Sequence, residues 1–183
     1  ALTHRLSSLS TPPVTIIGIE KDPAAIQLAR DNEAQLRRRG LLADSGMVKF
    51  LRMDVREPVM LGRHGLVATA DLVLSNPPYV PETALDEGHI SVEVRQDPHD
   101  AVFGGADGMS VIVPMVPVIA RTLTPGGVVG IEHDDTTADA VVSCLHAHGD
   151  FEEVTRHTDL TGRPRFVMAR RRQAGSVGRG MAG

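Results

Sequence analysis

The feature that most constrains the fold of this chain is a short apolar run that stops at an asparagine and two prolines. Asp71-Leu72-Val73-Leu74-Ser75 is followed directly by Asn76-Pro77-Pro78-Tyr79, which we call the Asn-Pro-Pro-Tyr loop. The apolar run Leu72 to Leu74 is typical of a strand buried on both faces, as in a parallel sheet covered by helices. Each proline fixes its own φ and lacks a backbone N–H, so the strand cannot continue. The sequence predicts a stiff loop at the carboxyl end of a strand, the edge where open α/β sheets bind ligands.

Such a loop is suited to holding an –NH2 group. An amide or aromatic-amine nitrogen is a poor nucleophile because its lone pair is delocalised. The side-chain oxygen of Asn76 and the backbone carbonyl of Pro77 could each accept one N–H, which would orient the lone pair and stabilise the charge that develops on nitrogen. Tyr79 would lie flat against the planar group. The alternative is a proline-rich turn with Tyr79 half-buried, but the whole tetrad after an apolar strand favours the functional interpretation.

Length and composition limit the classes of protein to which this chain can belong. The 183 residues suffice for one domain with a sizeable core, and 42% apolar and 23% charged residues are ordinary for a soluble protein. No stretch reaches the roughly 18 apolar residues of a membrane span, and no secretory signal is visible at Ala1, so we expect a cytoplasmic protein. The single cysteine, Cys144, excludes an internal disulfide framework and a cysteine-rich metal site, and we predict no metal. A net charge of −4 argues against a broad nucleic-acid surface.

Apolar runs alternate with helical patterns along the chain. Strands are predicted at about 14–19, 48–53, 72–74, 128–131, 151–156 and 165–169, and helices at about 24–38, 110–123 and 136–148. A weak helical pattern occurs at 90–94, a glycine-rich loop is expected at 101–109, and a turn at 125–127. This alternation predicts an α/β fold with a parallel, doubly wound sheet that one antiparallel strand completes. We predict a catalytic domain over residues 1–170 and a disordered tail over 171–183.

Three of the predicted strands end at an acidic residue: Glu20, Asp54 and Glu132. In a dinucleotide-type fold, an acid after the second strand accepts hydrogen bonds from the ribose hydroxyls, and an acid after the third can reach the adenine amine. Glu20 and Asp54 fit these two places. Carboxylates also end strands simply because the loop there is wet, but the matching position of Asn76 favours function. His133 is the nearest candidate for a general base, and we favour a structural role for it.

Several further motifs occur in an order that resembles one known family. They are Gly18-Ile19-Glu20-Lys21-Asp22-Pro23, Ala29-Arg30-Asp31-Asn32, Asp54, Ser75-Asn76-Pro77-Pro78-Tyr79, Asp97-Pro98, Gly104-Gly105-Ala106-Asp107-Gly108, Pro125-Gly126-Gly127 and Asp159-Leu160-x-Gly162-x-Pro164-Arg165. Up to about Arg170 the chain resembles the HemK/PrmC family of S-adenosylmethionine-dependent methyltransferases. Methyltransferases of adenine and guanine amines share the Asn-Pro-Pro-Tyr tetrad, so the Gly-Gly-x-Asp-Gly segment and the last motif are what point to this family.

The resemblance implies a class I methyltransferase fold with a Rossmann-like, mostly parallel sheet. It implies methyl transfer from S-adenosylmethionine to the side-chain amide nitrogen of a glutamine, in the Gly-Gly-Gln loop of peptide-chain release factors. By this resemblance Asn76 and Pro77 hold the amide, with Pro78 beside them, and Tyr79 packs on it. Glu20 then binds the cofactor ribose, Asp54 lies by the adenine, and Asn76 also faces the cofactor.

The chain departs from the family pattern in two ways. Class I methyltransferases carry a glycine-rich cofactor loop after their first, central strand, and this family also has an amino-terminal helical domain. We expect both to lie before Ala1, which would leave the catalytic domain without its first strand. In addition, Asp97 stands where the family more often has glutamate before proline.

Two other functional classes remain open. One is a methyltransferase of nucleic-acid amines, which would need a basic, aromatic-bearing face for a flipped base. The net acidity and an aromatic content of 3% count against it. The other is an inactive remnant that acts as a binding module.

Overall fold

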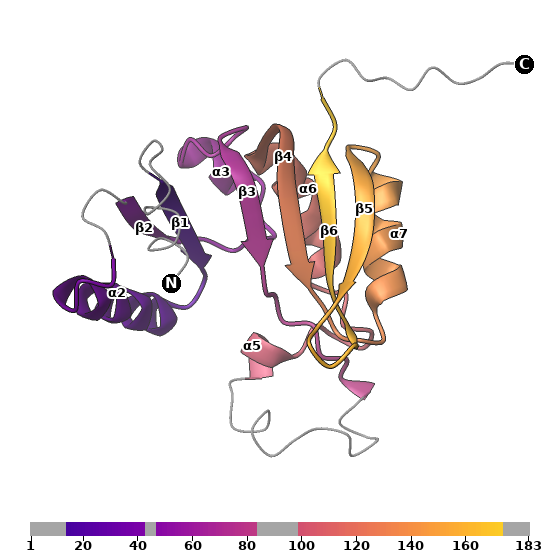
Figure 1. Cartoon of the computed structure of the whole chain (residues 1–183), viewed down its shortest axis with the longest axis horizontal. Coiled ribbons are helices and arrows are strands. Elements are labelled where there is room, and N and C mark those ends of the chain that lie inside the picture. Colours follow the sequence, from indigo (N-terminus) through magenta and orange to yellow (C-terminus); the bar gives the residue numbers. More distant parts are fainter. Residues whose placement is uncertain (1–13, 43–46, 84–98, 174–183) are drawn as a thin grey trace, which may run out of the picture. The chain divides into compact units, whose positions relative to one another are not determined.

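The computed structural model describes residues 14–42, 47–83 and 99–173 (Figure 1). The chain divides into two compact units, Ala1–Glu57 and Pro58–Gly183. The weak helical pattern at 90–94, the Asp97-Pro98 pair and residues 174–183 of the expected tail lie outside the described residues. Within the described ranges, no helix has the length and apolar character needed to cross a membrane.

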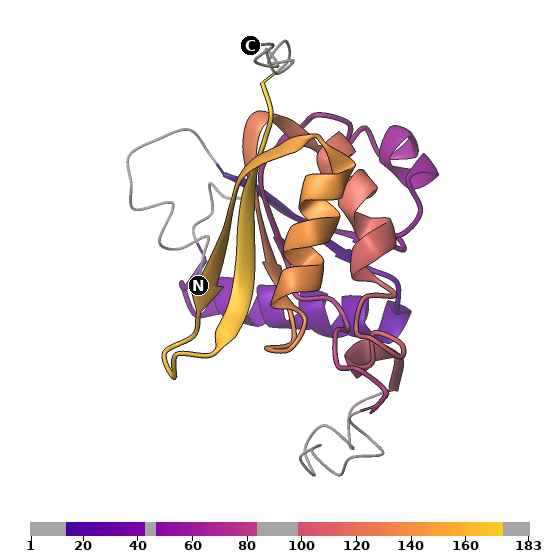
Figure 2. The same ribbon diagram turned by 90° about the vertical axis from the view of Figure 1, so that its right-hand side faces the viewer.

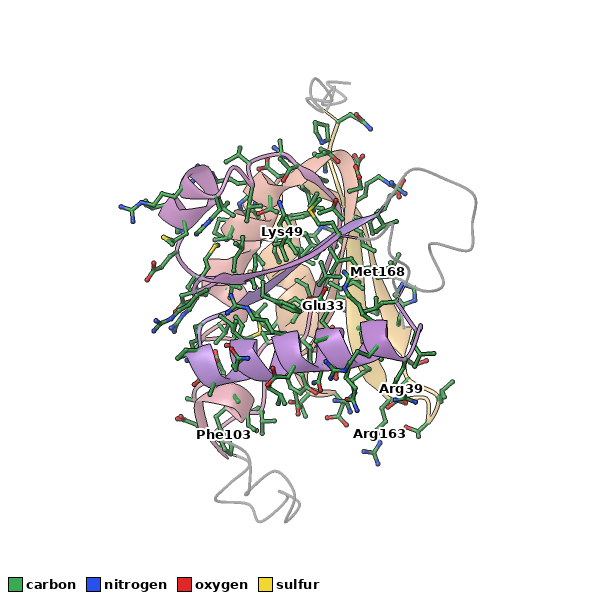
Figure 3. The ribbon with its side chains drawn as sticks, turned by 90° about the vertical axis from the view of Figure 1, so that its left-hand side faces the viewer. Glu33, Arg39, Lys49, Phe103, Arg163 and Met168 are labelled. Atoms are coloured by element: carbon green, nitrogen blue, oxygen red, sulfur yellow. The ribbon has the colours of Figure 1, made fainter. Side chains whose placement is uncertain are left out.

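The first unit is a strand, a helix and a second strand. Its elements are β1 (Thr15–Glu20), α2 (Pro23–Arg38) and β2 (Met47–Arg52). The two strands pair in parallel from Thr15↔Met47 to Glu20↔Arg52, as the predicted alternation requires. Helix α2 carries Glu33, and strand β2 carries Lys49 (Figure 3).

Local sequence explains where α2 begins. The Asp22 side chain accepts hydrogen bonds from the backbone N–H groups of Ala24 and Ala25, at 2.6 and 3.0 Å. Pro23, which has no N–H to leave unpaired, occupies the first helical position. The predicted cap and helix are confirmed.

The second unit is a four-stranded sheet with helices. Its elements are α3 (Val59–Arg63), β3 (Ala70–Ser75), α5 (His99–Val102), α6 (Ile112–Thr122), β4 (Leu123–Glu132), α7 (Ala138–His148), β5 (Phe151–Thr158) and β6 (Pro164–Arg171). The strand order is β3-β4-β6-β5; β3 and β4 are parallel, and β6 is antiparallel to both of its neighbours. The expected mostly parallel sheet with one antiparallel strand is thus confirmed: β6 is the last strand in sequence, but it lies between β4 and β5 in the sheet.

One face of this sheet forms the core of the second unit. Helices α6 and α7 lie on the same face (Figure 2), and α7 packs against β5 and β6. Fully buried side chains from these elements include Ile112, Val116, Val129, Ile131, Val141, Leu145, Phe151 and Val167. The expectation that β3 is buried on both faces was wrong for Leu72 and Leu74, whose exposed fractions are 48% and 62%. The apolar pattern identified the strand, but what packs on each face is a tertiary property.

Two predicted boundaries differ from the structure. Pro125-Gly126-Gly127 lies inside β4, not in a turn before it: Ala70 pairs with Leu123 but Leu72 with Val128, so the register shifts here. Arg171 belongs to β6, not to the tail, because the strand pairing continues through Arg171↔Phe151. The short helices α3 and α5 were not predicted, since four or five residues give too little periodicity.

Candidate active site

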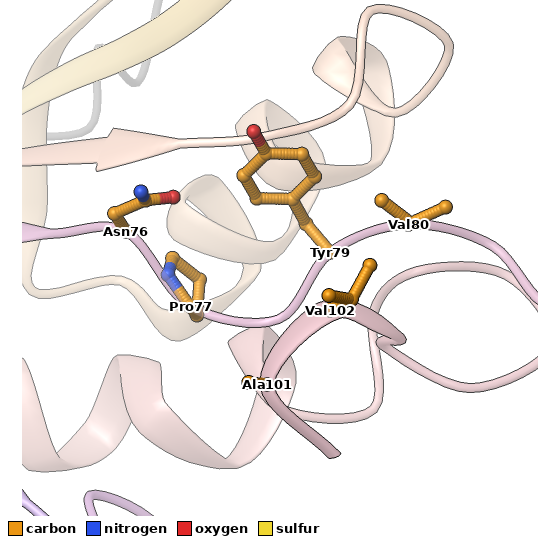
Figure 4. A pocket seen from close by; sticks show the side chains of 6 residues that line it. All are labelled: Asn76, Pro77, Tyr79, Val80, Ala101 and Val102. Carbon is orange, nitrogen blue, oxygen red and sulfur yellow. The ribbon is translucent and has the colours of Figure 1, made fainter. Parts of the chain in front are cut away.

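The Asn-Pro-Pro-Tyr loop follows β3 directly, as predicted. It borders a pocket of about 210 Å³ lined by Asn76, Pro77, Tyr79, Val80, Ala101 and Val102 (Figure 4). Three of the four residues expected to contact a substrate therefore line one pocket. Pro78 does not line it. The apolar side chains of Val80 and Val102 stand at the end of the pocket away from Asn76.

Two carbonyl groups at this pocket are free to accept hydrogen bonds. Asn76 is exposed, and its carboxamide has no hydrogen-bond partner among the residues that the structure describes. The same holds for the backbone carbonyl of Pro77, although the residue itself is buried. Pro77 and Pro78 have no backbone N–H, so neither residue can donate to these two acceptors. Two carbonyl oxygens without a partner among the described residues suit the loop to bind an –NH2 group.

The segment Gly104-Gly105-Ala106-Asp107-Gly108, the glycine-rich segment, packs on the backbone of this loop. Val80 donates its N–H to the Val102 carbonyl and accepts from Gly104, both at 3.0 Å. A Cβ atom at Gly104 would lie 2.7 Å from the Pro78 carbonyl oxygen. Only glycine permits this approach.

Gly108 is restricted in a second way. Its φ is +76°, in the left-handed region, and a Cβ there would collide with the Tyr79 carbonyl oxygen. The predicted loop at 101–109 is confirmed from Phe103 onward, whereas Ala101 and Val102 end α5. The glycines predicted a loop, but the sequence did not indicate that these glycines make room for the backbone carbonyl groups of Pro78 and Tyr79.

The hydroxyl of Tyr79 is held by a carboxylate that comes from another strand. It donates a hydrogen bond to Oε1 of Glu132, the last residue of β4, at 2.9 Å. Burial, and then the Glu132 carboxylate, raise the pKa of Tyr79 above its ordinary value, while Arg165 acts in the opposite direction. Sequence reasoning noted Glu132 only as a strand end and gave Arg165 no separate role.

His133 is buried at the end of β4, as the structural role favoured from the sequence would require. The residue is fully buried, and its backbone N–H donates to the Arg165 carbonyl at 3.1 Å. Its Nδ1 lies 2.7 Å from the Asp134 carbonyl oxygen, an acceptor, so Nδ1 carries the proton. Buried and bonded in this way, the ring ties the end of β4 to the following turn.

The two acids expected to bind the cofactor lie together in the first unit. Glu20 ends β1 and pairs with Arg52, and Asp54 lies two residues beyond Arg52. Oε1 of Glu20 accepts the backbone N–H groups of Lys21 and Asp22, at 2.7 and 2.9 Å. The Asp54 carboxylate is bound by the Arg56 guanidinium at 2.6 Å, which lowers the pKa of Asp54. Hydrogen bonds thus orient both carboxylates, one at the carboxyl end of β1 and the other just beyond the carboxyl end of the adjacent parallel strand β2.

The described ranges hold no group of three or more histidine, cysteine or acidic side chains that could bind a metal ion.

The fold is that of known methyltransferases. A methyltransferase from Pyrococcus furiosus superposes with a TM-score of 0.54 over 87% of this chain and 63% of its own, at 16% sequence identity. At such low identity the likeness shows the fold alone. Each unit contains one parallel strand pair, and the sheet of the second unit adds one antiparallel strand, so the chain has the class I methyltransferase fold that the resemblance implied.

Similarity in sequence is more informative about the kind of methyltransferase than similarity in fold. No model of a protein family matches the chain. The release factor glutamine methyltransferase of Corynebacterium glutamicum is 47% identical over 158 residues, which is 86% of this chain and 51% of the relative. That of Mycolicibacterium smegmatis is 44% identical over 161 residues, 87% of this chain and 52% of the relative. The chain thus spans about half the length of these curated relatives, and over that span it is similar to the release factor glutamine methyltransferases.

Proposed function

We propose that the protein containing this chain methylates the side-chain amide nitrogen of a glutamine, in the Gly-Gly-Gln loop of a peptide-chain release factor. The observation that carries this proposal is the pair of free carbonyl acceptors, on Asn76 and Pro77, at one pocket. Its support from outside the structure is the high identity to relatives named for this reaction.

Different residues of the pocket would contact different parts of a glutamine side chain. The Asn76 side-chain oxygen and the Pro77 carbonyl would each accept one N–H of the carboxamide, which localises the nitrogen lone pair for attack. Both oxygens would also stabilise the positive charge that develops on that nitrogen. The ring of Tyr79 would pack on the amide plane. Val80 and Val102 would contact the two methylene groups, for which a polar wall would be unsuitable.

We propose S-adenosylmethionine as the cofactor, with Glu20 and Asp54 as its ligands. The donor set fits: two oriented carboxylates at adjacent strand ends can accept hydrogen bonds from ribose hydroxyls and from an adenine amine. When bound, the cofactor supplies a methyl group on a sulfonium sulfur, which leaves as a neutral thioether. The amide nitrogen then loses one proton to water, so the chain needs no general base. This agrees with the buried, structural position of His133.

A nucleic-acid amine is the second candidate substrate, because the Asn-Pro-Pro-Tyr loop alone would hold one equally well. The net charge of −4 and the single tyrosine disfavour it, since a flipped base needs basic and aromatic contacts. We therefore infer a protein partner. A role in translation termination would place the protein in the cytoplasm.

Methyl transfer to defined substrates tests the proposal. The protein encoded by the complete reading frame is incubated with isotopically labelled S-adenosylmethionine and one of three substrates: release factor, ribosomal RNA or DNA. We expect one methyl group on the release factor, which mass spectrometry places on the glutamine of the Gly-Gly-Gln loop. A release factor with alanine at that glutamine is the control and should take up no label. Label on nucleic acid alone, or none on the release factor despite cofactor binding, would overturn the proposal.

A further inference from the structure

The Asn-Pro-Pro-Tyr loop fixes its own backbone, but it does not by itself fix the ring of Tyr79. The two prolines and the glycine-rich segment restrain the main chain, whereas the Tyr79 side chain keeps its own torsions. The ring is only half-buried, so packing leaves part of its surface open. A further restraint at the far end of the ring would determine the angle of the pocket wall.

Glu132 supplies that restraint. Its carboxylate accepts the Tyr79 hydroxyl at 2.9 Å, across 53 residues of sequence. Glu132 is itself held at the end of β4, where it pairs with Phe166 of β6. A hydrogen bond to an ionised acceptor is stronger than one between neutral groups. The orientation of the ring is therefore tied to the rigid sheet and not to the loop alone.

The motif from Asp159 to Arg165 also contributes a side chain near the Tyr79 hydroxyl and the Glu132 carboxylate. Arg165 lies one residue before Phe166, and its guanidinium is 3.5 Å from the His133 carbonyl oxygen and 3.9 Å from the Asp159 carboxylate. It is also close enough to the Tyr79 hydroxyl to oppose the effect of Glu132 on the pKa of that group. The motif from Asp159 to Arg165 thus places a cation beside the Tyr79–Glu132 pair.

We propose that Glu132 is a positioning residue, which acts on the methyl-acceptor amide through Tyr79 by holding the ring as a fixed wall of the pocket. The proposal rests on the function proposed above. Glu132 does not line the pocket and transfers no proton in this scheme. Its contribution is to keep the ring parallel to the amide plane, so that the nitrogen lone pair stays aligned for attack.

The contact can be tested without any substrate, because Tyr79 is the only tyrosine and the chain has no tryptophan. Ultraviolet absorbance of the tyrosinate therefore titrates this one hydroxyl in the 183-residue chain. We expect Glu132→Gln to lower the pKa of Tyr79 toward its ordinary value, but not fully, because burial is the larger cause. Glu152→Gln is the matched control: Glu152 lies at the other end of the sheet, paired with Arg170 of β6. Identical titrations in the wild type, Glu132→Gln and Glu132→Ala would refute the contact.

A double-mutant cycle then tests the effect on catalysis. In the protein from the complete reading frame, Glu132→Ala and Tyr79→Phe should each lower kcat for the release factor about tenfold. The double variant should be no slower than the slower single variant, because both changes remove one interaction. Glu132→Gln keeps an oxygen acceptor for the Tyr79 hydroxyl, so it should retain most of the wild-type kcat. If Glu132→Ala is slow only because it is destabilised, its free energy of unfolding should fall as well.

The outcomes separate this inference from the proposed function. If the wild type does not methylate the release factor, the proposed function fails, and the optical titration still decides the Tyr79–Glu132 contact. If the wild type is active but Glu132→Ala is as fast, or if the two variants have additive effects, the positioning role is wrong while the function stands.

Discussion

The backbone carbonyl oxygen of Tyr79 occupies the space that a Cβ atom at Gly108 would need. Two segments that lie 29 residues apart in sequence, at positions 79 and 108, are thereby packed main chain against main chain. The glycine-rich segment is a support for the Asn-Pro-Pro-Tyr loop, and it shapes the pocket without lining it.

Gly108→Ala should therefore disturb both stability and activity. The new methyl group collides with the Tyr79 carbonyl, and alanine is strained at a φ of +76°. We expect the free energy of unfolding to fall by roughly 1–3 kcal/mol, measured by urea denaturation, and turnover to fall with it. Gly62→Ala is the control. It lies in α3 with no atom within 4 Å of the added Cβ, so it should leave the protein as stable or slightly more stable. Equal effects of the two substitutions would contradict the proposed support.

A larger side chain in the pocket should weaken binding of the substrate and leave binding of the cofactor unchanged. Val102 lines the pocket away from Asn76, so Val102→Phe would occupy the space proposed for the glutamine methylenes. We expect KM for the release factor to rise about tenfold or more, with the Kd of S-adenosylmethionine nearly unchanged by calorimetry. Val113→Phe, an exposed position on α6, is the control for the added aromatic ring. An unchanged KM in Val102→Phe would mean that the substrate binds elsewhere.

The turn between β5 and β6 should contribute a pH-dependent stability. The Asp159 carboxylate accepts from the Thr161 hydroxyl and from the N–H groups of Thr161 and Arg163, which lowers the pKa of Asp159. A lowered folded-state pKa gives stability that is complete above the unfolded-state pKa and disappears as the pH falls through the folded-state pKa.

The Tm difference between the wild type and Asp159→Asn should therefore be largest near neutral pH and shrink in acid. Scanning calorimetry from pH 7 downward measures it. Asp135→Asn, at an exposed carboxyl, should show a small difference at every pH. A Tm difference for Asp159→Asn that grows as the pH falls would contradict this assignment.

Features with a local signal were predictable from the sequence. Asp22-Pro23 marked the start of α2, and the prolines after Ser75 marked the end of β3, because caps and chain breakers act within a few residues. The strand ends Glu20 and Asp54 could be placed together because parallel pairing aligns their positions. The site roles of these residues remain predictions.

Features that depend on distant contacts were not predictable. Tyr79 and Glu132 are 53 residues apart, and no periodic pattern pairs them. The exposure of Leu72 and Leu74 depends on what packs against each face of the sheet, whereas a run of apolar residues only indicates a strand. The glycines of the segment at 104–108 predicted a loop, but the carbonyl groups of Pro78 and Tyr79 explain why glycine is needed.

Turnover of Asn76→Ala is the most direct measurement of the central claim, that this loop holds an amide for methylation. In the protein from the complete reading frame, we expect kcat for the release factor to fall by a factor of order 10² or more, with cofactor binding nearly intact. Gln35→Ala removes an exposed carboxamide on α2 and should change neither quantity. Wild-type turnover in Asn76→Ala would contradict the account.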